Sequence, residues 1–248
     1  MIGGKDVFYT GVSVIAEMYW CHKKAMLRAA EKAQMFATWW RFMMSRKEVC
    51  PEEVAVATKD RIIFHPHPRV FGESPDELKG KSKWIRLGTE GEAMFCPYRE
   101  EAEAAFSYKD LRIGAIPDGI GDDWVGEFKV TKLPRYTGAV ARCQANLYAF
   151  IFQKPWYEVM LYHPITEKYY TRQREVDPDR AIDDLEKFLA LIKGEMEPWP
   201  CKEWKCKHCD HKKECESVWH GDNPSGWIEY RDWMIELGGP LIYVDSKR

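Results

Sequence analysis

The stretch DLRIGAIPDGIGDDWVGEFKV, residues 110–130, indicates most about which fold the sequence favours. It contains two short runs rich in β-branched and aromatic residues, separated by GIGDD, and this composition is typical of a β-hairpin. Side chains alternate along a strand, so Glu127 and Lys129 project from one face of the second run. Phe128 and Trp124 project from the other face. The hairpin therefore places a carboxylate and an ammonium group side by side.

A turn centred on the DD pair at 122–123 makes Asp118 the cross-strand neighbour of Glu127. Two adjacent carboxylates repel each other, and a hard divalent cation such as Mg2+ or Mn2+ relieves that repulsion. Such a cation can activate a water against a phosphodiester, while Lys129 offsets charge in the transition state. A surface hairpin with an ordinary ion pair is the alternative interpretation of an isolated D…E-x-K pattern.

The rest of the chain alternates between helical and strand patterns. Helices are expected at 13–46, within 87–106, at 136–153 and at 177–196, and a strand pair at 156–164 and 168–176. Residues 47–86 are interpreted as an irregular insertion with one short strand, RIIFH. The aromatic run TWWRF at 38–42 favours a packing face over a surface that stacks nucleic-acid bases.

Composition limits the class of protein. The 248 residues, 45% of them hydrophobic, suffice for one ample core, or for a large and a small domain. The net charge of -2 argues against a chain coated in positive charge, although it allows a local basic groove. Lys5 and Asp6 lie where a signal peptide would need an unbroken apolar segment, and no run of 18 apolar residues, long enough for a membrane-spanning helix, occurs. A cytoplasmic location is therefore expected.

The cysteines are clustered in a way that favours metal binding. Cys206, Cys209 and Cys215 follow a C-x2-C-x5-C spacing, and clustered cysteines in a reducing compartment are interpreted first as metal ligands. Three thiolates leave one ligand of a four-ligand site unassigned. A zinc site could complete the set with a nearby histidine, His208 or His211.

Several short motifs follow one another in a characteristic order. Gly88 precedes Glu92 by four residues in GTEGE, the D…E-x-K hairpin comes next, and QANLY then places Gln144 and Tyr148 on one helix face. In this order the set resembles the RecB-like branch of the PD-(D/E)XK nucleases. The resemblance is closest to the CRISPR-associated Cas-four exonuclease family, and it covers about residues 10–216, apart from 47–86.

The resemblance implies a fold and a domain organisation. The expected fold class is α/β: a restriction-endonuclease-like core with a central mixed sheet flanked by helices, plus a small cysteine-held iron–sulfur lobe. The resemblance implies four segments. Residues 1–46 form an N-terminal helical segment that contributes one cluster cysteine, and residues 47–86 form the irregular insertion. Residues 87–195 form the nuclease core, and residues 196–248 form the C-terminal cluster-binding segment and tail.

The resemblance also implies roles for individual residues. The catalytic metal would be held by three carboxylates and one backbone carbonyl, those of Glu92, Asp118, Glu127 and Phe128. Lys129 would be the catalytic lysine, and Gln144 and Tyr148 would hold the DNA strand or the geometry of the site. Many relatives have histidine where this chain has Glu92, and Glu90 competes for the same role.

In some nucleases of this branch the cysteines hold a 4Fe-4S cluster whose first ligand lies far upstream. The resemblance therefore implies Cys21 as the fourth ligand, together with Cys206, Cys209 and Cys215. Zinc held by the same thiolates is the competing occupant. Cys201 is a spare thiol near the cluster, and it could replace one of the four ligands.

The function implied is metal-dependent hydrolysis of DNA, with single strands or frayed ends as the preferred exonuclease substrate. The implied setting is DNA trimming in CRISPR spacer acquisition, with the integrase proteins Cas-one and Cas-two as partners. A phage or recombination nuclease would show the same motifs, and a nuclease acting on RNA is a further alternative. The rival from another class is a non-catalytic nucleic-acid-binding module with a structural iron–sulfur or zinc site.

Overall fold

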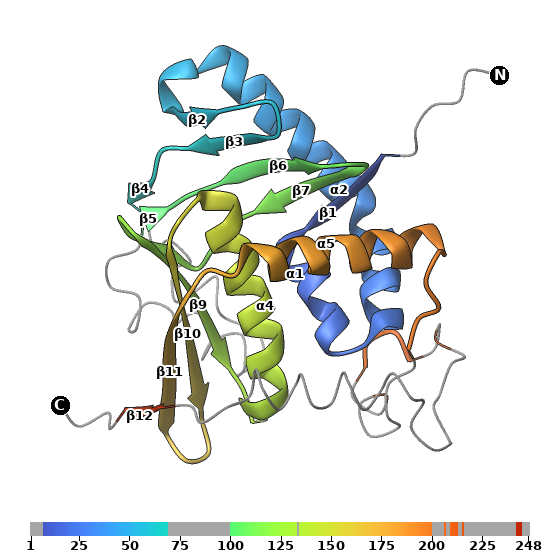
Figure 1. Cartoon of the computed structure of the whole chain (residues 1–248), viewed down its shortest axis with the longest axis vertical. Coiled ribbons are helices and arrows are strands. Elements are labelled where there is room, and N and C mark those ends of the chain that lie inside the picture. Colours follow the sequence, from blue (N-terminus) through green and yellow to red (C-terminus); the bar gives the residue numbers. More distant parts are fainter. Residues whose placement is uncertain are drawn as a thin grey trace, which may run out of the picture.

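Two five-stranded mixed sheets form the framework of the chain in its computed structural model (Figure 1). The structure describes residues 7–68, 100–132, 134–199, 206, 209–212, 215 and 242–244. Within these residues the fold is α/β, with four α-helices packed on the sheets. No helix in these segments is both long and apolar enough to cross a membrane.

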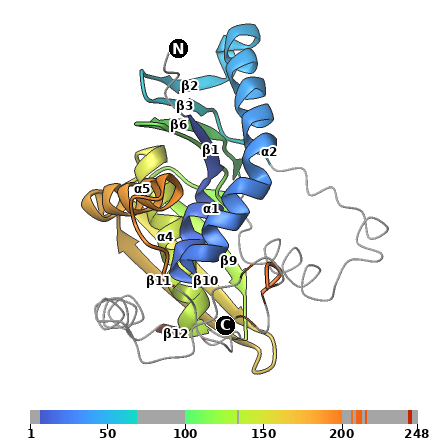
Figure 2. The same ribbon diagram turned by 90° about the vertical axis from the view of Figure 1, so that its right-hand side faces the viewer.

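The first sheet gathers strands from distant parts of the sequence. Its strand order is β1-β7-β6-β3-β2, with β1 parallel to β7 and the other neighbours antiparallel. The strands are β1 (Phe8–Gly11), β7 (Leu111–Ala115), β6 (Ala104–Tyr108), β3 (Arg61–Phe64) and β2 (Val54–Ala57). Figure 2 shows the long helix α2 (His22–Val49) running along one face of this sheet.

The second sheet carries the strand with Glu127 and Lys129. Its order is β12-β11-β10-β9-β8, and only β9 and β10 run parallel. The strands are β8 (Gly119–Ile120), β9 (Trp124–Val130), β10 (Trp156–His163), β11 (Lys168–Glu175) and β12 (Ile242–Val244). Helix α4 (Pro134–Phe152) connects β9 to β10, as a parallel pair requires a crossover, and it packs against both strands.

Short elements complete the described framework. Helix α1 (Val12–Ala16) and the 3-10 turn η1 (Glu17–Tyr19) join β1 to α2, and α1 contacts α4. The 3-10 turn η2 (Pro51–Glu53) follows α2, and a two-stranded sheet pairs β4 (His67–Pro68) with β5 (Glu100–Glu101).

Helix α5 (Pro178–Lys193) shows how local sequence signals produce an element. The Asp177 side chain caps its start by accepting a hydrogen bond from the backbone N–H of Arg180 at 2.9 Å. Pro178 occupies the first turn, where a missing N–H costs nothing. Gly194 ends the helix at φ 72°, a left-handed conformation that glycine adopts without penalty. The prediction of a helix from Asp177 is confirmed.

Other local predictions are confirmed and some are wrong. The helix at 136–153 and the strand pair correspond to α4 and β10–β11. The hairpin is confirmed only in its second strand: the first run forms β7, which pairs with β1 and β6, and β9 pairs instead with β8, within the stretch expected to separate the two runs. The single helix at 13–46 is interrupted, because Cys21 adopts an extended conformation, at φ −167°, and becomes the N-cap of α2. The end of the expected helix within 87–106 forms strands β5 and β6 instead.

The expectation of one central sheet is also wrong, since the described strands form two large sheets. The physical reason is that β7 pairs with β1 and β6 and not with β9, so the chain passes from one sheet to the other between β7 and β8. The first sheet also includes part of the segment interpreted as an irregular insertion. Its residues 54–64 form the hairpin β2–β3, and β3 pairs with β6, where Ile62 lies opposite Ala105. Ile62, Ile63 and Phe64 are buried, so this hairpin extends the first sheet and its core. The boundaries drawn between the four segments stay a prediction.

Helix α4 lies at the centre of the main core. Its small residues Ala139, Ala141, Ala145 and Ala149 are fully or almost fully buried, which allows close approach to the strands and to α1 and α5. Leu147 is also completely buried in this cluster. The helix is enclosed on several sides, so polar side chains on two of its faces lie within the protein.

Candidate functional site

The hairpin β8–β9 brings the predicted carboxylates together. Gly119 pairs with Gly126 and Ile120 with Val125, and this register places Asp118, just before β8, opposite Glu127. The Asp118 carboxylate accepts a hydrogen bond from the backbone N–H of Phe128 at 2.9 Å. Asp118 lies where the chain leaves β7 of the first sheet and enters β8 of the second. The cross-strand proximity expected from the turn is present.

Lys129 joins both carboxylates. Its Nζ forms an ion pair with Glu127 and lies 3.9 Å from Oδ2 of Asp118. The Glu127 side chain is completely buried, whereas those of Asp118 and Lys129 are 21% and 32% exposed. The site is thus open to solvent on the side of Asp118 and Lys129 and closed behind Glu127. A substrate can reach the lysine and the first carboxylate without unfolding the strand.

Helix α4 adds the two remaining predicted residues from above. Gln144 Nε2 donates a hydrogen bond to the Tyr148 hydroxyl at 3.3 Å, and both residues are buried. The pKa of Tyr148 lies well above 10, first because of burial and then because the charge of Glu127 opposes ionisation. Asp118 acts in the same sense, while the hydrogen bond from Gln144 acts against it. Five predicted side chains, those of Asp118, Glu127, Lys129, Gln144 and Tyr148, therefore lie close together.

The two other predicted metal ligands are Phe128 and Glu92. Phe128 is buried at 2% exposure between the two charged residues of β9, and its backbone N–H already binds Asp118. Glu92, like its competitor Glu90, lies outside the described residues. In the part of the chain that is described, no three His, Cys, Asp or Glu side chains are arranged as metal ligands. The divalent-metal site and the four-cysteine site thus both stay predictions.

A cavity of about 320 Å³ opens beside Tyr148. Phe36 and Trp39 of α2 contribute aromatic rings to its wall, and Ile116 lies between β7 and Asp118 in the sequence. Trp39 also packs against the cluster of Met43, Ile62, Phe64 and Ala105. The aromatic run on α2 therefore serves as a packing face, as expected, and also borders the space next to the carboxylate site.

The cysteines from the two ends of the chain meet beside the first turn of α2. Cys21 and Cys206 are buried at 6% and 5% exposure and form one apolar cluster, with Trp20 packed against it. Cys209 is close enough that negative charge on Cys21 or Cys206 would raise its pKa, although burial is the largest cause of that rise. The Cys21 sulfur accepts the backbone N–H of Lys24 at 3.5 Å.

The segment after Cys206 also makes polar contacts with α2. Arg28 lies 3.7 Å from Asp210, and His211 Nε2 lies 3.7 Å from a carboxylate oxygen of Glu31. The backbone N–H of Cys215 donates to the carbonyl of His211 at 3.0 Å. The His211 ring is thus directed at Glu31. His208 and Cys201 lie outside the described residues.

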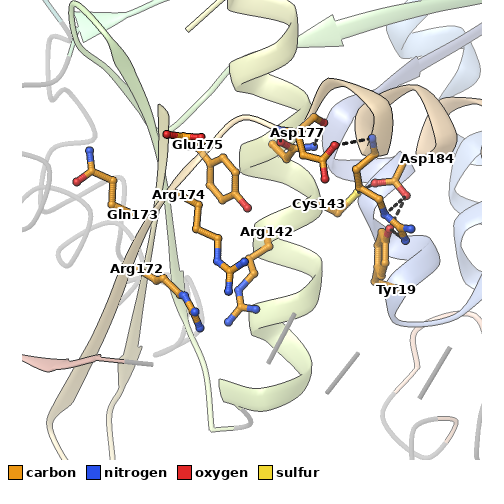
Figure 3. A pocket seen from close by; sticks show the side chains of 12 residues that line it. Tyr19, Arg142, Cys143, Arg172, Gln173, Arg174, Glu175, Asp177 and Asp184 are labelled. Carbon is orange, nitrogen blue, oxygen red and sulfur yellow. Dashed lines mark hydrogen bonds and ion pairs between the residues drawn. The ribbon is translucent and has the colours of Figure 1, made fainter. Parts of the chain in front are cut away.

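Sequence reasoning missed a second polar site. A pocket of about 500 Å³ lies between α4, β11 and α5, and four of its lining residues are arginines: Arg142, Arg172, Arg174 and Arg180 (Figure 3). A signal was present in the sequence, because R-x-R at 172–174 puts two arginines on one face of a strand. The third, Arg142, joins them only through the packing of α4.

Comparison with known proteins gives limited information. No protein-family model and no curated protein matches the chain. Among solved structures, an alkaline exonuclease (LHK-Exo) from Laribacter hongkongensis is 19% identical over 48% of this chain and 75% of its own, with a TM-score of 0.32. LHK-Exo in complex with dAMP gives 14% identity over 76% and 89% of the two chains and a TM-score of 0.31.

The protein SSO0001 is 14% identical over 88% of this chain and 90% of its own, with a TM-score of 0.44. Identities of 14–19% and TM-scores below 0.5 establish neither a family nor an activity for this chain.

Proposed function

We propose that the protein is a metal-dependent nuclease that hydrolyses phosphodiester bonds of single-stranded DNA at Asp118, Glu127 and Lys129. One observation carries the proposal: the hairpin register and α4 bring Asp118, Glu127, Lys129, Gln144 and Tyr148 to a single place.

The residues present fit a hard divalent cation. Asp118 and Glu127 supply carboxylate oxygens, the ligands that Mg2+ and Mn2+ prefer, and one of them is held in a fully buried position. These two residues would hold the ion, with Glu92 and the carbonyl of Phe128 as further ligands implied by the resemblance. When bound, the metal would polarise the phosphodiester and lower the pKa of a water molecule.

The chain's own groups orient and stabilise the reacting phosphate. In hydrolysis a water oxygen forms a bond to phosphorus, the bond to the leaving oxygen breaks, and negative charge accumulates on the phosphoryl oxygens. The Lys129 ammonium, partly exposed beside Asp118, offsets that charge. Tyr148 keeps its proton because burial raises its pKa, so its hydroxyl can donate a hydrogen bond to an anion.

The surroundings favour a single strand over a duplex. The aromatic cavity beside Tyr148 offers Phe36 and Trp39, and aromatic side chains stack unpaired bases regardless of sequence. Bases in a duplex are already stacked and cannot enter such a cavity without unpairing. An exonuclease acting on single strands or frayed ends is therefore the proposed form of the activity.

We also propose that Cys21, Cys206, Cys209 and Cys215 hold a 4Fe-4S cluster. Support comes from the meeting of Cys21 with Cys206 and Cys209 across most of the sequence, and from the placement of Cys21 at a helix N-terminus, which favours a thiolate. Zinc would use the same thiolates. DNA trimming in spacer acquisition, with integrase partners, is the setting that the resemblance implies and stays a prediction.

The test of the nuclease is cleavage of end-labelled single-stranded DNA with Mg2+ or Mn2+, compared with excess chelator. We expect wild-type protein to cleave only with metal and Lys129→Ala to lose at least about 100-fold in rate. The matched control is Lys59→Ala, which removes an exposed lysine in the β2–β3 turn and should cleave normally. Cleavage by Lys129→Ala at the wild-type rate would refute the assignment. DNA binding without cleavage by any protein would favour the binding module.

The test of the cluster is metal and sulfide content after anaerobic purification. We expect iron and acid-labile sulfide in equal amounts, reduced together with the melting temperature in Cys21→Ser. The control is Cys50→Ser, because Cys50 ends α2 far along the helix from Cys21. Stoichiometric zinc would identify the other occupant, and unchanged iron in Cys21→Ser would show that Cys21 is not a ligand.

A further inference from the structure

We propose that the pocket between α4, β11 and α5 is a phosphate-binding site, separate from the carboxylate centre, that takes a terminal phosphomonoester such as that of a nucleotide. Three arginines, Arg142, Arg172 and Arg174, would bind the phosphate, and their side chains gather in the same region of the pocket (Figure 3). This proposal does not depend on the nuclease activity.

The register of β10 and β11 explains why two arginines face inward. Arg172 lies opposite Val159, and Arg174 lies opposite Tyr157. Val159 and Tyr157 are buried at 0% and 5% exposure on the side of β10 that packs against the core. Paired residues of neighbouring strands share a face, so both guanidinium groups point toward the core side, where α4 lies.

Arg142 comes to the same place from α4 and is the most telling residue of the pocket. It is 2% exposed, and its Nε and one terminal nitrogen are buried without a hydrogen-bond partner. Within the described part of the chain no carboxylate forms an ion pair with it. Burial and repulsion from Arg172 and Arg174 lower its pKa to about 10. A buried cation that only stabilised the fold would have a partner.

The carboxylates of the pocket do not neutralise this cluster. Asp184 is engaged by Tyr19, by Arg180 at 3.4 Å and by the Cys143 thiol at 3.4 Å. Asp177 caps α5 through its side chain, and its backbone groups bind Asn146 at 2.8 and 2.9 Å.

Glu175 follows Arg174 in β11, so strand alternation directs it to the opposite face. Arg142 and Arg174 each keep a buried nitrogen without a hydrogen-bond partner, so two positive charges remain unmatched among the described residues.

These unmatched positive charges indicate which ligand the pocket would bind. A terminal phosphomonoester carries close to two negative charges at neutral pH, whereas a phosphodiester carries one. Guanidinium groups bind phosphate oxygens in pairs of hydrogen bonds, and this makes arginine the preferred residue for such recognition. The volume of about 500 Å³ falls in the range of small-molecule sites and admits a nucleoside as well as its phosphate.

The two faces of α4 keep this pocket apart from the carboxylate site. Arg142 and Asn146 line the pocket, while Gln144 and Tyr148 face the carboxylates. At 100° per residue, positions 142 and 146 lie nearly opposite 144 and 148 around the helix. Binding of a phosphomonoester can therefore be measured without divalent metal, when the carboxylate centre is inactive.

The experiment is titration calorimetry of the full chain with AMP in the presence of chelator, with adenosine as the matched ligand that lacks the phosphate. We expect AMP to bind and adenosine not to bind. Arg142→Met should weaken AMP binding about 10- to 100-fold, the effect of losing charged hydrogen bonds. Arg41→Gln, which removes an exposed arginine of α2 outside the pocket, should bind AMP as the wild type does.

A stability measurement separates binding from structure. Removing an unpartnered buried cation should raise the melting temperature of Arg142→Met by about 2–4 °C, although the same change destroys binding. If that variant does not fold, Arg172→Gln and Arg174→Gln, both half-buried, provide the same test. Equal binding of AMP and adenosine, or unchanged affinity in all three variants, would overturn the proposal.

Two further ligands identify the source of the phosphate. A 5′-phosphorylated oligonucleotide that binds better than its 5′-hydroxyl form assigns the site to a strand end. Preference for AMP over both assigns it to a free nucleotide, and each result supports a phosphomonoester site. Binding of a phosphopeptide with none of the nucleotides bound would refute a nucleotide site. Lys129→Ala should bind AMP normally, so failure of the nuclease proposal would leave this result intact.

Discussion

The two faces of helix α4 contact clusters of charged residues that differ in their charge balance. On one face Gln144 and Tyr148 lie over Asp118 and Glu127, and Lys129 forms ion pairs with both carboxylates. On the other face Arg142 meets two more arginines, while the neighbouring carboxylates are bound elsewhere. The first cluster is nearly balanced within the protein, whereas the second carries a surplus of positive charge.

The difference in charge balance predicts how each cluster affects the stability of the fold. A balanced cluster is stabilised by its own contacts, so removing one member should harm both fold and chemistry. An unbalanced cluster of like charges opposes folding, and burial, followed by repulsion from neighbouring arginines, lowers the pKa of Arg142 and Arg172. A ligand of opposite charge is the natural explanation for retaining such a cluster. The two faces should therefore respond to mutation in different directions.

The largest expected contrast is in catalysis. Glu127→Gln should slow cleavage of single-stranded DNA by about 1000-fold, because it removes the negative charge of the buried carboxylate. Arg142→Met, on the opposite face of α4, should keep the wild-type rate on a 5′-hydroxyl substrate. Rates are compared under single-turnover conditions. Equal losses in both variants would show that the two faces form one functional unit.

A smaller contrast concerns the tyrosines that lie near each cluster. Tyr148→Phe removes the hydroxyl that Gln144 contacts beside the carboxylates and should slow cleavage about 10-fold. Tyr157→Phe makes the same change at a buried tyrosine beside the arginines and should leave the rate unchanged. A larger effect from Tyr157 than from Tyr148 would contradict the division of roles along α4.

The next contrast is one of sign in thermal stability. Gln144→Leu leaves the buried Tyr148 hydroxyl without this donor and should lower the free energy of unfolding by about 1 kcal/mol. Arg142→Met should raise it by a similar amount, because a buried like charge is removed. Calorimetric melting of both variants beside the wild type measures the difference. Destabilisation by Arg142→Met would indicate that the arginine has a structural partner.

The smallest expected effect is the response to alkali. The pKa of Tyr148 is raised above that of an unfolded tyrosine, so its contribution to stability is present below pH 10 and is lost as pH rises further. The pKa of Arg142 is lowered to about 10, so the unfolded state binds more protons above that pH and stability rises there. Between pH 9 and 10.5, Tyr148→Phe should flatten the fall in melting temperature, and Arg142→Met should steepen it. Identical slopes would contradict these assignments.

The face of α4 that could be predicted from the sequence is the one built from local patterns. Asp118, Glu127 and Lys129 lie within one hairpin, and the turn alone determines which residues are neighbours. Gln144 and Tyr148 share a helix face because they are four residues apart. Helix α5 was equally predictable, since its cap and its final glycine act within the helix itself.

The other face required contacts that no local pattern encodes. The arginine pocket depends on the register of β10 with β11 and on the orientation of α4 above them. The division into two sheets depends on pairing β1 with β7 and β3 with β6, which are far apart in the sequence. The break at Cys21 was hidden because the flanking residues are all compatible with a helix.

The most direct test of the central claim is the cleavage rate of Asp118→Asn on end-labelled single-stranded DNA with Mg2+. Asparagine keeps the size of the side chain and an oxygen that can accept the Phe128 N–H, but it removes the charge needed beside Glu127 and Lys129. We expect a loss of about 1000-fold with a melting temperature close to that of the wild type. Cleavage at the wild-type rate by this variant would show that the carboxylate pair is not the hydrolytic centre.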